Sequence, residues 1–142
     1  MEQQTPVSRD RGADLDTLYS PILLAADESV QDIDDIDRAA GRFDVINIKL
    51  DKCGGLTEAL AMVAAAKAHG LGVMVGNMLG TSLAMAPAFI IGQFCDIVDL
   101  DGPILLRRDR TPNAIYAGGT IACPDGLWGA PRIRKLALPI EG

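Results

Sequence analysis

Four short apolar segments recur along the chain, and three of them are followed by a stretch with the composition of a helix. Their short length and apolar character predict strands that are buried on both faces. The predicted strands are PILLAA (21–26), VINIK (45–49), GVMVG (72–76) and CDIVDL (95–100). Strands that alternate with helices at this spacing predict βαβ units and a parallel sheet.

The first predicted helix covers residues 28–41. Ser29 can cap its amino end, with Asp32 three residues further on, as in a capping box. Gly41 stands where the helix is expected to end.

Two further helices are predicted between the later strands. Residues 56–70 form the clearest helix, because the segment is rich in alanine, carries acid early and base late, and ends at Gly70. Residues 81–94 are predicted to form a helix that is kinked or irregular at Pro87, since proline has no backbone N–H to donate.

The repeat length matches the βα unit of a TIM barrel, and four units make half of an eight-stranded barrel. The predicted fold class is therefore α/β, a half of a TIM-like (β/α) barrel. We expect an N-terminal segment (1–20), four βα units (21–110) and an irregular tail (111–142) with short strand-like pieces such as AIYAGG. A doubly wound sheet is the structural alternative, although no G-x-G-x-x-G and no Walker loop follows any strand.

Composition excludes several classes of protein. Hydrophobic residues make up 49% and charged residues 23% of the 142 residues, as in a globular protein. The net charge of −6 argues against a nucleic-acid surface. Cys53, Cys95 and Cys123 lack metal-ligand spacing, the N-terminus lacks an apolar signal region, and the most apolar run (83–91) is too short to cross a bilayer. We therefore expect reduced thiols in a cytoplasmic protein without a membrane span.

Polar residues stand at or just after the carboxyl end of every predicted strand. They are Asp27 and Glu28, then Lys49 and Asp51, then Asn77, and finally Asp99 and Asp101. In a βα barrel these strand ends point to one face, where the chemistry takes place. Carboxylates suit a hard divalent cation such as Mg²⁺, and a partly desolvated lysine close to a metal can act as a base.

Each of these residues also has an ordinary structural explanation. Asp27 and Glu28 could be acids at a helix N-terminus, and Lys49 could extend along the strand end with its ammonium group in water. The segment DLDG (99–102) could be a simple turn. The functional interpretation depends on the pattern, since four successive strands all end in candidate ligands.

Four motifs occur in a fixed order: AADES, NIKLDKCGGLTEAL, VGNMLGTSLAMAPA and DLDGP. Together they resemble the C-terminal half of the enolase superfamily. They are most similar to the muconate-lactonizing-enzyme subgroup and, within it, to the dipeptide (L-Ala-D/L-Glu) epimerases. The resemblance extends from Glu2 to about Trp128. It implies barrel strands five to eight of a TIM-like barrel, Mg²⁺ as the cofactor and a dipeptide as the substrate.

The resemblance also implies roles for individual residues. Lys49 matches the family's base on the sixth barrel strand. Asp27 matches the third acid that holds Mg²⁺, and Glu2 stands at about the distance of the second acid. Asp99 and Asp101 match the pair that meets the substrate ammonium group. The remaining candidates are Asn77 and Met78, which would bind the substrate, and Glu28 and Asp51, which would support the residues that touch it.

The implied reaction removes the proton α to a carboxylate and gives an enediolate that Mg²⁺ stabilises. A lysine on one face removes the proton, and a second lysine on the other face returns one. The family's K-x-K lysine, its first metal ligand and its capping domain have no match in this sequence. We therefore expect an incomplete site with two unpaired sheet edges, and either a homo-oligomer or association with a missing N-terminal half.

Three functions remain open from the sequence. The first is the C-terminal portion of a Mg²⁺-dependent dipeptide epimerase. The second is another reaction of the muconate-cycloisomerase or mandelate-racemase type, against which the paired acids of DLDGP argue, since they suit an ammonium group. The third is a non-catalytic half-barrel that assembles with a partner.

Overall fold

The structure is a computed structural model that describes residues 21–128. Its main sheet contains β1 (Ala25–Ala26), β2 (Val45–Lys49), β3 (Gly72–Gly76) and β4 (Ile97–Val98), and a separate hairpin contains β5 (Ile115–Ala117) and β6 (Thr120–Ala122). The α-helices are α1 (Ile36–Ala39), α2 (Leu50–Cys53), α3 (Leu56–Ala68), α4 (Ser82–Met85) and α5 (Ala88–Gly92). Three 3-10 turns are η1 (Ile33–Asp35), η2 (Gly102–Leu105) and η3 (Asp125–Trp128).

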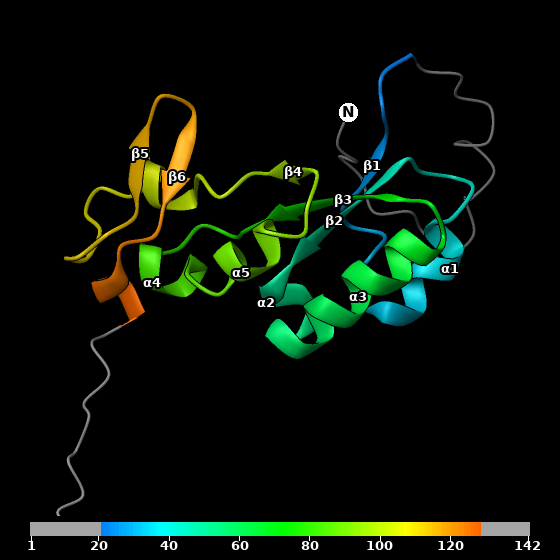
Figure 1. The fold of residues 1–142 in the computed structure, drawn as a ribbon, viewed down its shortest axis with the longest axis horizontal. Helices are drawn as coiled ribbons and strands as arrows, with labels where there is room; N and C mark the ends of the chain where they lie inside the picture. The colour runs from blue at the N-terminus through cyan, green and yellow to red at the C-terminus, as the bar shows by residue number, and fades with distance from the viewer. Residues whose placement is uncertain (1–20, 129–142) are drawn as a thin grey trace, which may run out of the picture.

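The strands of the main sheet follow one another in chain order, β1-β2-β3-β4, and every neighbouring pair is parallel. Helices α1, α3 and α5 lie on the same side of this sheet (Figure 1). Right-handed crossovers place all helices on one face when the strand order never reverses, whereas a doubly wound sheet reverses its order. The described part is therefore a partial βα barrel, and the predicted fold class is confirmed.

The central strands β2 and β3 have the predicted bounds. Side chains alternate between the two faces of a strand, so that Ile46 and Ile48 on β2 face the helices together with Val73 and Val75 on β3. All four are at most 1% exposed. Helix α3 covers them with fully or nearly fully buried side chains, which are Ala59, Met62, Val63 and Ala66.

The opposite face of the sheet changes character along the strands. The first residues of β1 and β2, Ala25 and Val45, form a small apolar cluster with Met74 in the middle of β3. Two and four residues further along β2, the same face carries Asn47 and Lys49. The period of two that buries the core on one face therefore also brings polar side chains to the carboxyl end of the other.

The first helix is shorter than the predicted 28–41, since η1 and α1 together cover only residues 33–39. The expected cap at Ser29 is wrong. Asp32 caps the turn through the N–H of Asp34, and Asp35 completes the capping box. Aspartate side chains bond readily to nearby backbone N–H groups, so this acid-rich segment forms a looped start instead of a full helix.

The outer strands are also shorter than predicted. The ladder of β1 includes only the last two residues of the expected strand 21–26. In the expected strand 95–100, Cys95 donates instead to Gly92 at the end of α5. The N–H groups of Asp96 and Asp99 donate to Val73 and Val75, so hydrogen bonding extends one residue beyond β4 at each end.

Two helix predictions are confirmed in their main features. Helix α3 occupies most of the expected range 56–70, and Gly70 follows it with a φ of 73°, a conformation that glycine adopts without strain. The expected helix 81–94 is divided into α4 and α5, and the break falls at Pro87. No helix in the described range 21–128 is long and apolar enough to cross a membrane.

The hairpin of β5 and β6 is attached to α4 by a buried hydroxyl group. Ser82 is 0% exposed, and its Oγ accepts from the N–H of Ala114 at 2.9 Å. The same hydroxyl donates to Asp109, which also accepts from the Ser82 N–H at 3.1 Å. Burial opposes the ionisation of Asp109, but the hydrogen bonds from Ser82 and from the N–H of Arg110 outweigh it, and the pKa of Asp109 is lowered.

We expect Ser82→Ala to reduce the free energy of unfolding by about 1–3 kcal/mol, because it leaves buried polar partners without a hydrogen bond. Urea unfolding at neutral pH measures this loss. Thr57→Ala, at an exposed position of α3, is the control and should change the free energy by no more than about 0.5 kcal/mol.

The effect should also depend on pH. A lowered pKa means that ionised Asp109 contributes stability above the ordinary carboxyl pKa and loses that contribution as the pH falls through its own lowered value. Ser82→Ala removes one hydrogen bond to this carboxylate. The free energies of unfolding of the variant and of wild type should therefore become more similar in acid. If the two free energies of unfolding differ by the same amount at neutral and at acidic pH, ionised Asp109 does not stabilise the fold through Ser82.

Candidate functional site

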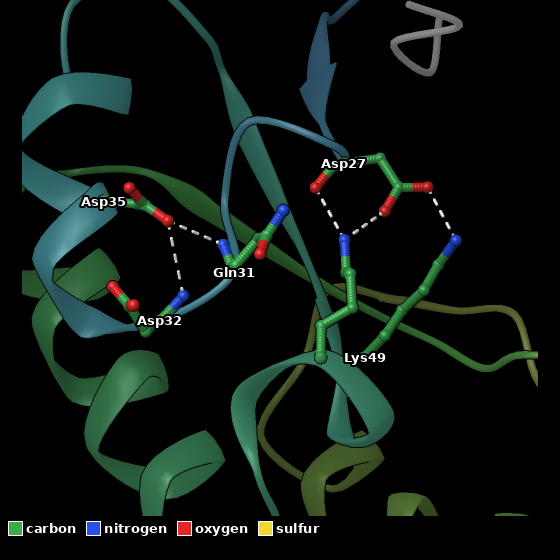
Figure 2. Close-up of polar contacts among 6 residues, drawn as sticks. Asp27, Gln31, Asp32, Asp35 and Lys49 are labelled. Atoms are coloured by element: carbon green, nitrogen blue, oxygen red, sulfur yellow. Dashed lines mark hydrogen bonds and ion pairs between the residues drawn. The ribbon is translucent and has the colours of Figure 1, made fainter. Parts of the chain in front are cut away.

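A buried carboxylate lies between two lysines at the carboxyl ends of β1 and β2. Asp27 directly follows β1 and is 3% exposed. One of its oxygens, Oδ2, accepts from Lys49 Nζ at 2.6 Å (Figure 2). The other, Oδ1, accepts from Lys52 Nζ at 2.5 Å. Lys52 Nζ also donates to the main-chain oxygen of Asp27 at 2.6 Å. Both carboxylate oxygens are therefore bound by cations of the chain itself.

The local fold explains why two lysines reach the same acid. Lys49 is the last residue of β2, and β2 pairs with β1. The single turn α2 begins at the next residue, and Gly54 ends it with a φ of 87°. Lys52 thus follows Lys49 by three residues, within the single turn of α2.

The loop after Asp27 is held by its own backbone and by a second acid. The N–H of Val30 donates to the Asp27 carbonyl at 3.2 Å. Asp35, which is 9% exposed, accepts from the N–H groups of Gln31 at 2.8 Å and Asp32 at 3.4 Å (Figure 2). These bonds limit the positions that the Asp27 carboxylate can take.

The side chains around Asp27 fit a divalent cation only in part. Carboxylate oxygen is the ligand that Mg²⁺ prefers, so Asp27 fits as one ligand. Within residues 21–128, no group of three or more His, Cys, Asp and Glu side chains is placed to hold a metal ion. The predicted ligand Glu2 lies outside the described residues. A cation bound to Asp27 would have to replace at least one of the two ammonium groups.

A pair of acids follows β4 on the side of the sheet that carries Lys49. The pKa of Asp99 is raised, mainly by partial burial of its carboxyl group and further by the negative charge of Asp101. The N–H of Asp101 and the positive charge of Lys49 act in the opposite direction. Two neighbouring carboxylates that repel each other provide a favourable place for a cationic group such as an ammonium.

Two glycines allow the strand ends to approach one another closely. A Cβ on Gly76, which pairs with Lys49 across the sheet, would lie 3.2 Å from Lys49 Cε and 2.8 Å from Asn47 Oδ1. A Cβ on Gly102 would collide with Asn77 Nδ2 and lie 2.9 Å from the Met78 carbonyl oxygen. The loop after β3 is therefore in direct contact with the segment that carries the acid pair.

The structure brings Asp27 and Lys49 together and places the charge of Lys49 within reach of Asp99. The other predicted residues are more scattered. The Asn77 amide donates to the Met78 carbonyl at 2.9 Å, and the Met78 side chain is 53% exposed. Of the predicted supporting residues, Glu28 lines a cavity beside α1, and Asp51 lines a small pocket together with Asn77 and Met78.

Three residues at this contact were not predicted from the sequence, namely Lys52, Asn47 and Gly76. Lys52 could have been found from its spacing, because a lysine three residues after the strand-end lysine and just before Gly54 fits one helical turn. Asn47 is 1% exposed and lies two residues before Lys49 on the same face, so strand alternation could have identified it. Nothing in the sequence indicates the close approach at Gly76.

Comparisons with known proteins agree with the predicted family. The model of the family described as Enolase C-terminal domain-like matches residues 1–127. An N-acetyl-D-glutamate racemase from a Pseudoalteromonas species is 43% identical over 130 residues, which cover 91% of this chain and 41% of the racemase. The L-Ala-D/L-Glu epimerase of Escherichia coli K12 is 39% identical over 121 residues, covering 85% of this chain and 37% of the epimerase. The chain thus spans about two fifths of the length of these curated relatives.

A solved structure gives the same result for the fold. It is an enolase family member from Agrobacterium tumefaciens with homology to dipeptide epimerases, determined with bound sodium and L-Ala-L-Glu. The TM-score is 0.79 at 48% sequence identity, and the match covers 89% of this chain and 38% of that protein.

We expect Gly76→Ala to disturb the contact between Lys49 and Asp27. The added Cβ must displace the buried Asn47 amide or the Lys49 side chain, and such overpacking costs about 1–3 kcal/mol. Urea unfolding measures the loss of stability, and NMR of the Lys49 side chain measures its displacement.

The matched control is Gly80→Ala, whose Cβ would meet its nearest neighbour, Ala84 Cβ, at an ordinary 3.4 Å. This variant should leave the Lys49 signals at their wild-type positions. Equal behaviour of the two variants would show that Gly76 is not required for the close approach.

Proposed function

The chain belongs to the Enolase C-terminal domain-like family, and from this premise we propose that it forms the C-terminal part of a Mg²⁺-dependent dipeptide epimerase. The observation that carries the proposal is the contact of Lys49 Nζ with the buried Asp27 carboxylate, 2.6 Å apart at the ends of two paired strands. The acid pair that follows β4 supplies the third element of the site.

Lys49 is proposed as the residue that moves the proton at the α-carbon of the substrate. Its side chain is 15% exposed, so the ammonium group is largely shielded yet still reachable from the open face of the sheet. Its position at the end of the central strand β2 gives it a rigid backbone, as a positioned acid–base residue requires.

Asp27 is proposed as a ligand of Mg²⁺, with Glu2 as a second ligand. The ion, when bound, would stabilise negative charge on the substrate carboxylate and so make the α-proton easier to remove. Asp27 contributes a carboxylate that is buried and fixed by the loop contacts described above. Lys52 keeps this carboxylate oriented through its bonds to Oδ1 and to the main-chain oxygen.

Asp99 and Asp101 are proposed to bind the ammonium group of a dipeptide. An ammonium between them would relieve the repulsion that contributes to the raised pKa of Asp99. Asn77 and Met78, on the loop that touches Gly102, are proposed to lie beside the substrate. Glu28 and Asp51 are proposed to support these residues without touching the substrate or the ion.

The two edge strands of the sheet suggest how the site would be completed. Pairing within the described part leaves β1 and β4 at the edges, and Ile97 and Val98 on β4 are 42% and 45% exposed. We propose that further strands cover these edges, either from the remaining part of a protein as long as its relatives or from a second copy.

A second candidate function is racemisation of an N-acylated amino acid. The observation in its favour is the 43% identity to the protein named N-acetyl-D-glutamate racemase. An N-acetyl group has no positive charge, so the two functions differ in their need for the acid pair. Asp99→Asn should impair the use of a dipeptide much more than the use of N-acetylglutamate if the first proposal is right.

The test of the proposed function is exchange and inversion at the α-carbon in D₂O. The chain is mixed with the part of the Escherichia coli relative that it does not match, Mg²⁺ and L-Ala-L-Glu are added, and deuterium at the Glu α-carbon is followed by NMR. We expect Mg²⁺-dependent exchange that Lys49→Ala reduces by about 10²–10⁴-fold, as is typical for loss of a general base.

The matched control is Lys67→Ala, since Lys67 is an exposed lysine on α3 away from the strand ends. This variant should exchange the α-proton at the wild-type rate. If neither the mixture nor the chain alone exchanges the proton, or if Lys49→Ala exchanges it as fast as Lys67→Ala, the proposed function is wrong.

A further inference from the structure

The hairpin that follows the barrel units makes a direct bond to the segment of the acid pair. Tyr116, on β5, donates its hydroxyl proton to the carbonyl oxygen of Leu100 at 2.7 Å. Leu100 is the residue between Asp99 and Asp101, and it is 0% exposed. The middle of the DLD segment (99–101) is thus held by Leu100, through its buried side chain and its hydrogen-bonded carbonyl.

Tyr116 is itself held from several directions. Its side chain packs against the main hydrophobic core, and its hydroxyl oxygen lies 3.8 Å from Met85 Sδ on α4. The strand that carries it pairs with β6 and begins one residue after Ala114, whose N–H donates to the buried Ser82 hydroxyl. The hydroxyl therefore comes from a well-supported part of the chain.

The other side of the same segment is fixed by close packing. Gly102 lies so near Asn77 and Met78 that no Cβ would fit there. The four residues from Asp99 to Gly102 are thus held between the loop after β3 and the hairpin. The backbone that carries the acid pair is thus held on both sides, while Asp99 and Asp101 themselves are exposed.

The hydroxyl of Tyr116 stays protonated under all ordinary conditions. Burial, followed by the negative charges of Asp101 and Asp109, raises the pKa of Tyr116 to about 12. A carbonyl oxygen can only accept, so a protonated hydroxyl is required for this bond. The bond to Leu100 is consequently available at every pH at which the acid pair titrates.

We propose that Tyr116 is a positioning residue that sets the spacing of Asp99 and Asp101 through its hydrogen bond to Leu100, and so contributes to the preference for a substrate with a free ammonium group. The part that concerns the substrate rests on the proposed function. The part that concerns the spacing of the carboxylates does not depend on it.

The first experiment measures the acid pair directly in the full chain. Carboxyl ¹³C NMR follows the titration of Asp99 in wild type and in Tyr116→Phe, which loses the hydroxyl but keeps the ring that packs on the core. We expect the pKa of Asp99 to move down toward the ordinary carboxyl value in the variant, because partial burial and the neighbouring charge, which raise it, both weaken when the segment relaxes.

Thr120→Val is the matched control. Thr120 lies on β6 of the same hairpin, and its exposed hydroxyl donates to Ala117 at 2.7 Å without touching the DLD segment. This variant also loses one hydroxyl from the hairpin, yet it should titrate like wild type at Asp99. An Asp99 titration that is unchanged in a folded Tyr116→Phe chain would overturn the positioning role, and the amide NMR spectrum verifies the fold.

The second experiment compares L-Ala-L-Glu with its N-acetylated form, in the presence of Mg²⁺, by NMR titration of the same three chains. Wild type and Thr120→Val should prefer the free amine, and Tyr116→Phe should lose about threefold to tenfold of that preference, the effect of one ordinary hydrogen bond. A variant that keeps the full preference would overturn the inference about specificity.

The two experiments also separate the inference from the proposed function. If wild type shows no preference for the free amine, the dipeptide assignment is wrong, whereas the Asp99 titration still decides whether Tyr116 sets the spacing of the pair. If wild type prefers the amine but Asp99 titrates alike in all three chains, the function stands and the role of Tyr116 is refuted.

Discussion

The contact between a buried carboxylate and two ammonium groups joins β1, β2 and α2 at the carboxyl end of the sheet. Asp27 at the end of β1 binds Lys49 from β2 and Lys52 from α2. Taking such charges out of water is costly, and only close pairing offsets the cost. The contact therefore requires the observed register of β1 against β2 and a helical turn, α2, directly after β2. It also requires the loop after Asp27 to fold back on itself.

One alternation along the strands produces both the core and the site. On β2, Ile46 and Ile48 face the helices, whereas Asn47 and Lys49 face the open side. A shift of one residue in the register would bury Lys49 under α3 and expose isoleucine, at a cost no single contact could recover. The register that stabilises the core is thus the same constraint that places the lysine beside Asp27.

The sequence predicted best those elements that depend on interactions between residues close together in the chain. The bounds of β2 and β3 were predicted correctly because short apolar runs between glycines and charges leave few alternatives. The first helix was predicted too long, because its cap was expected at Ser29. The structure has the cap at Asp32, whose side chain accepts from the N–H of Asp34 and whose own N–H donates to Asp35. The hydrogen bond of Tyr116 to Leu100 was not predictable, since it spans 16 residues and joins a region that resembles a tail to a strand end.

The position of that hairpin bears on how an acid pair can select a cation. Two flexible carboxylates would separate, take up water and lose most of their preference for an ammonium group. A pair whose backbone is held on both sides would keep more of its repulsion, which a cation that enters would relieve. Partial burial and the charge of Asp101 already favour a proton on Asp99, so an ammonium ligand competes with that proton and binds more tightly as the pH rises above the pKa of Asp99. The fixed backbone around Leu100 would then be the physical source of the preference for an ammonium group, which the two carboxylates contact.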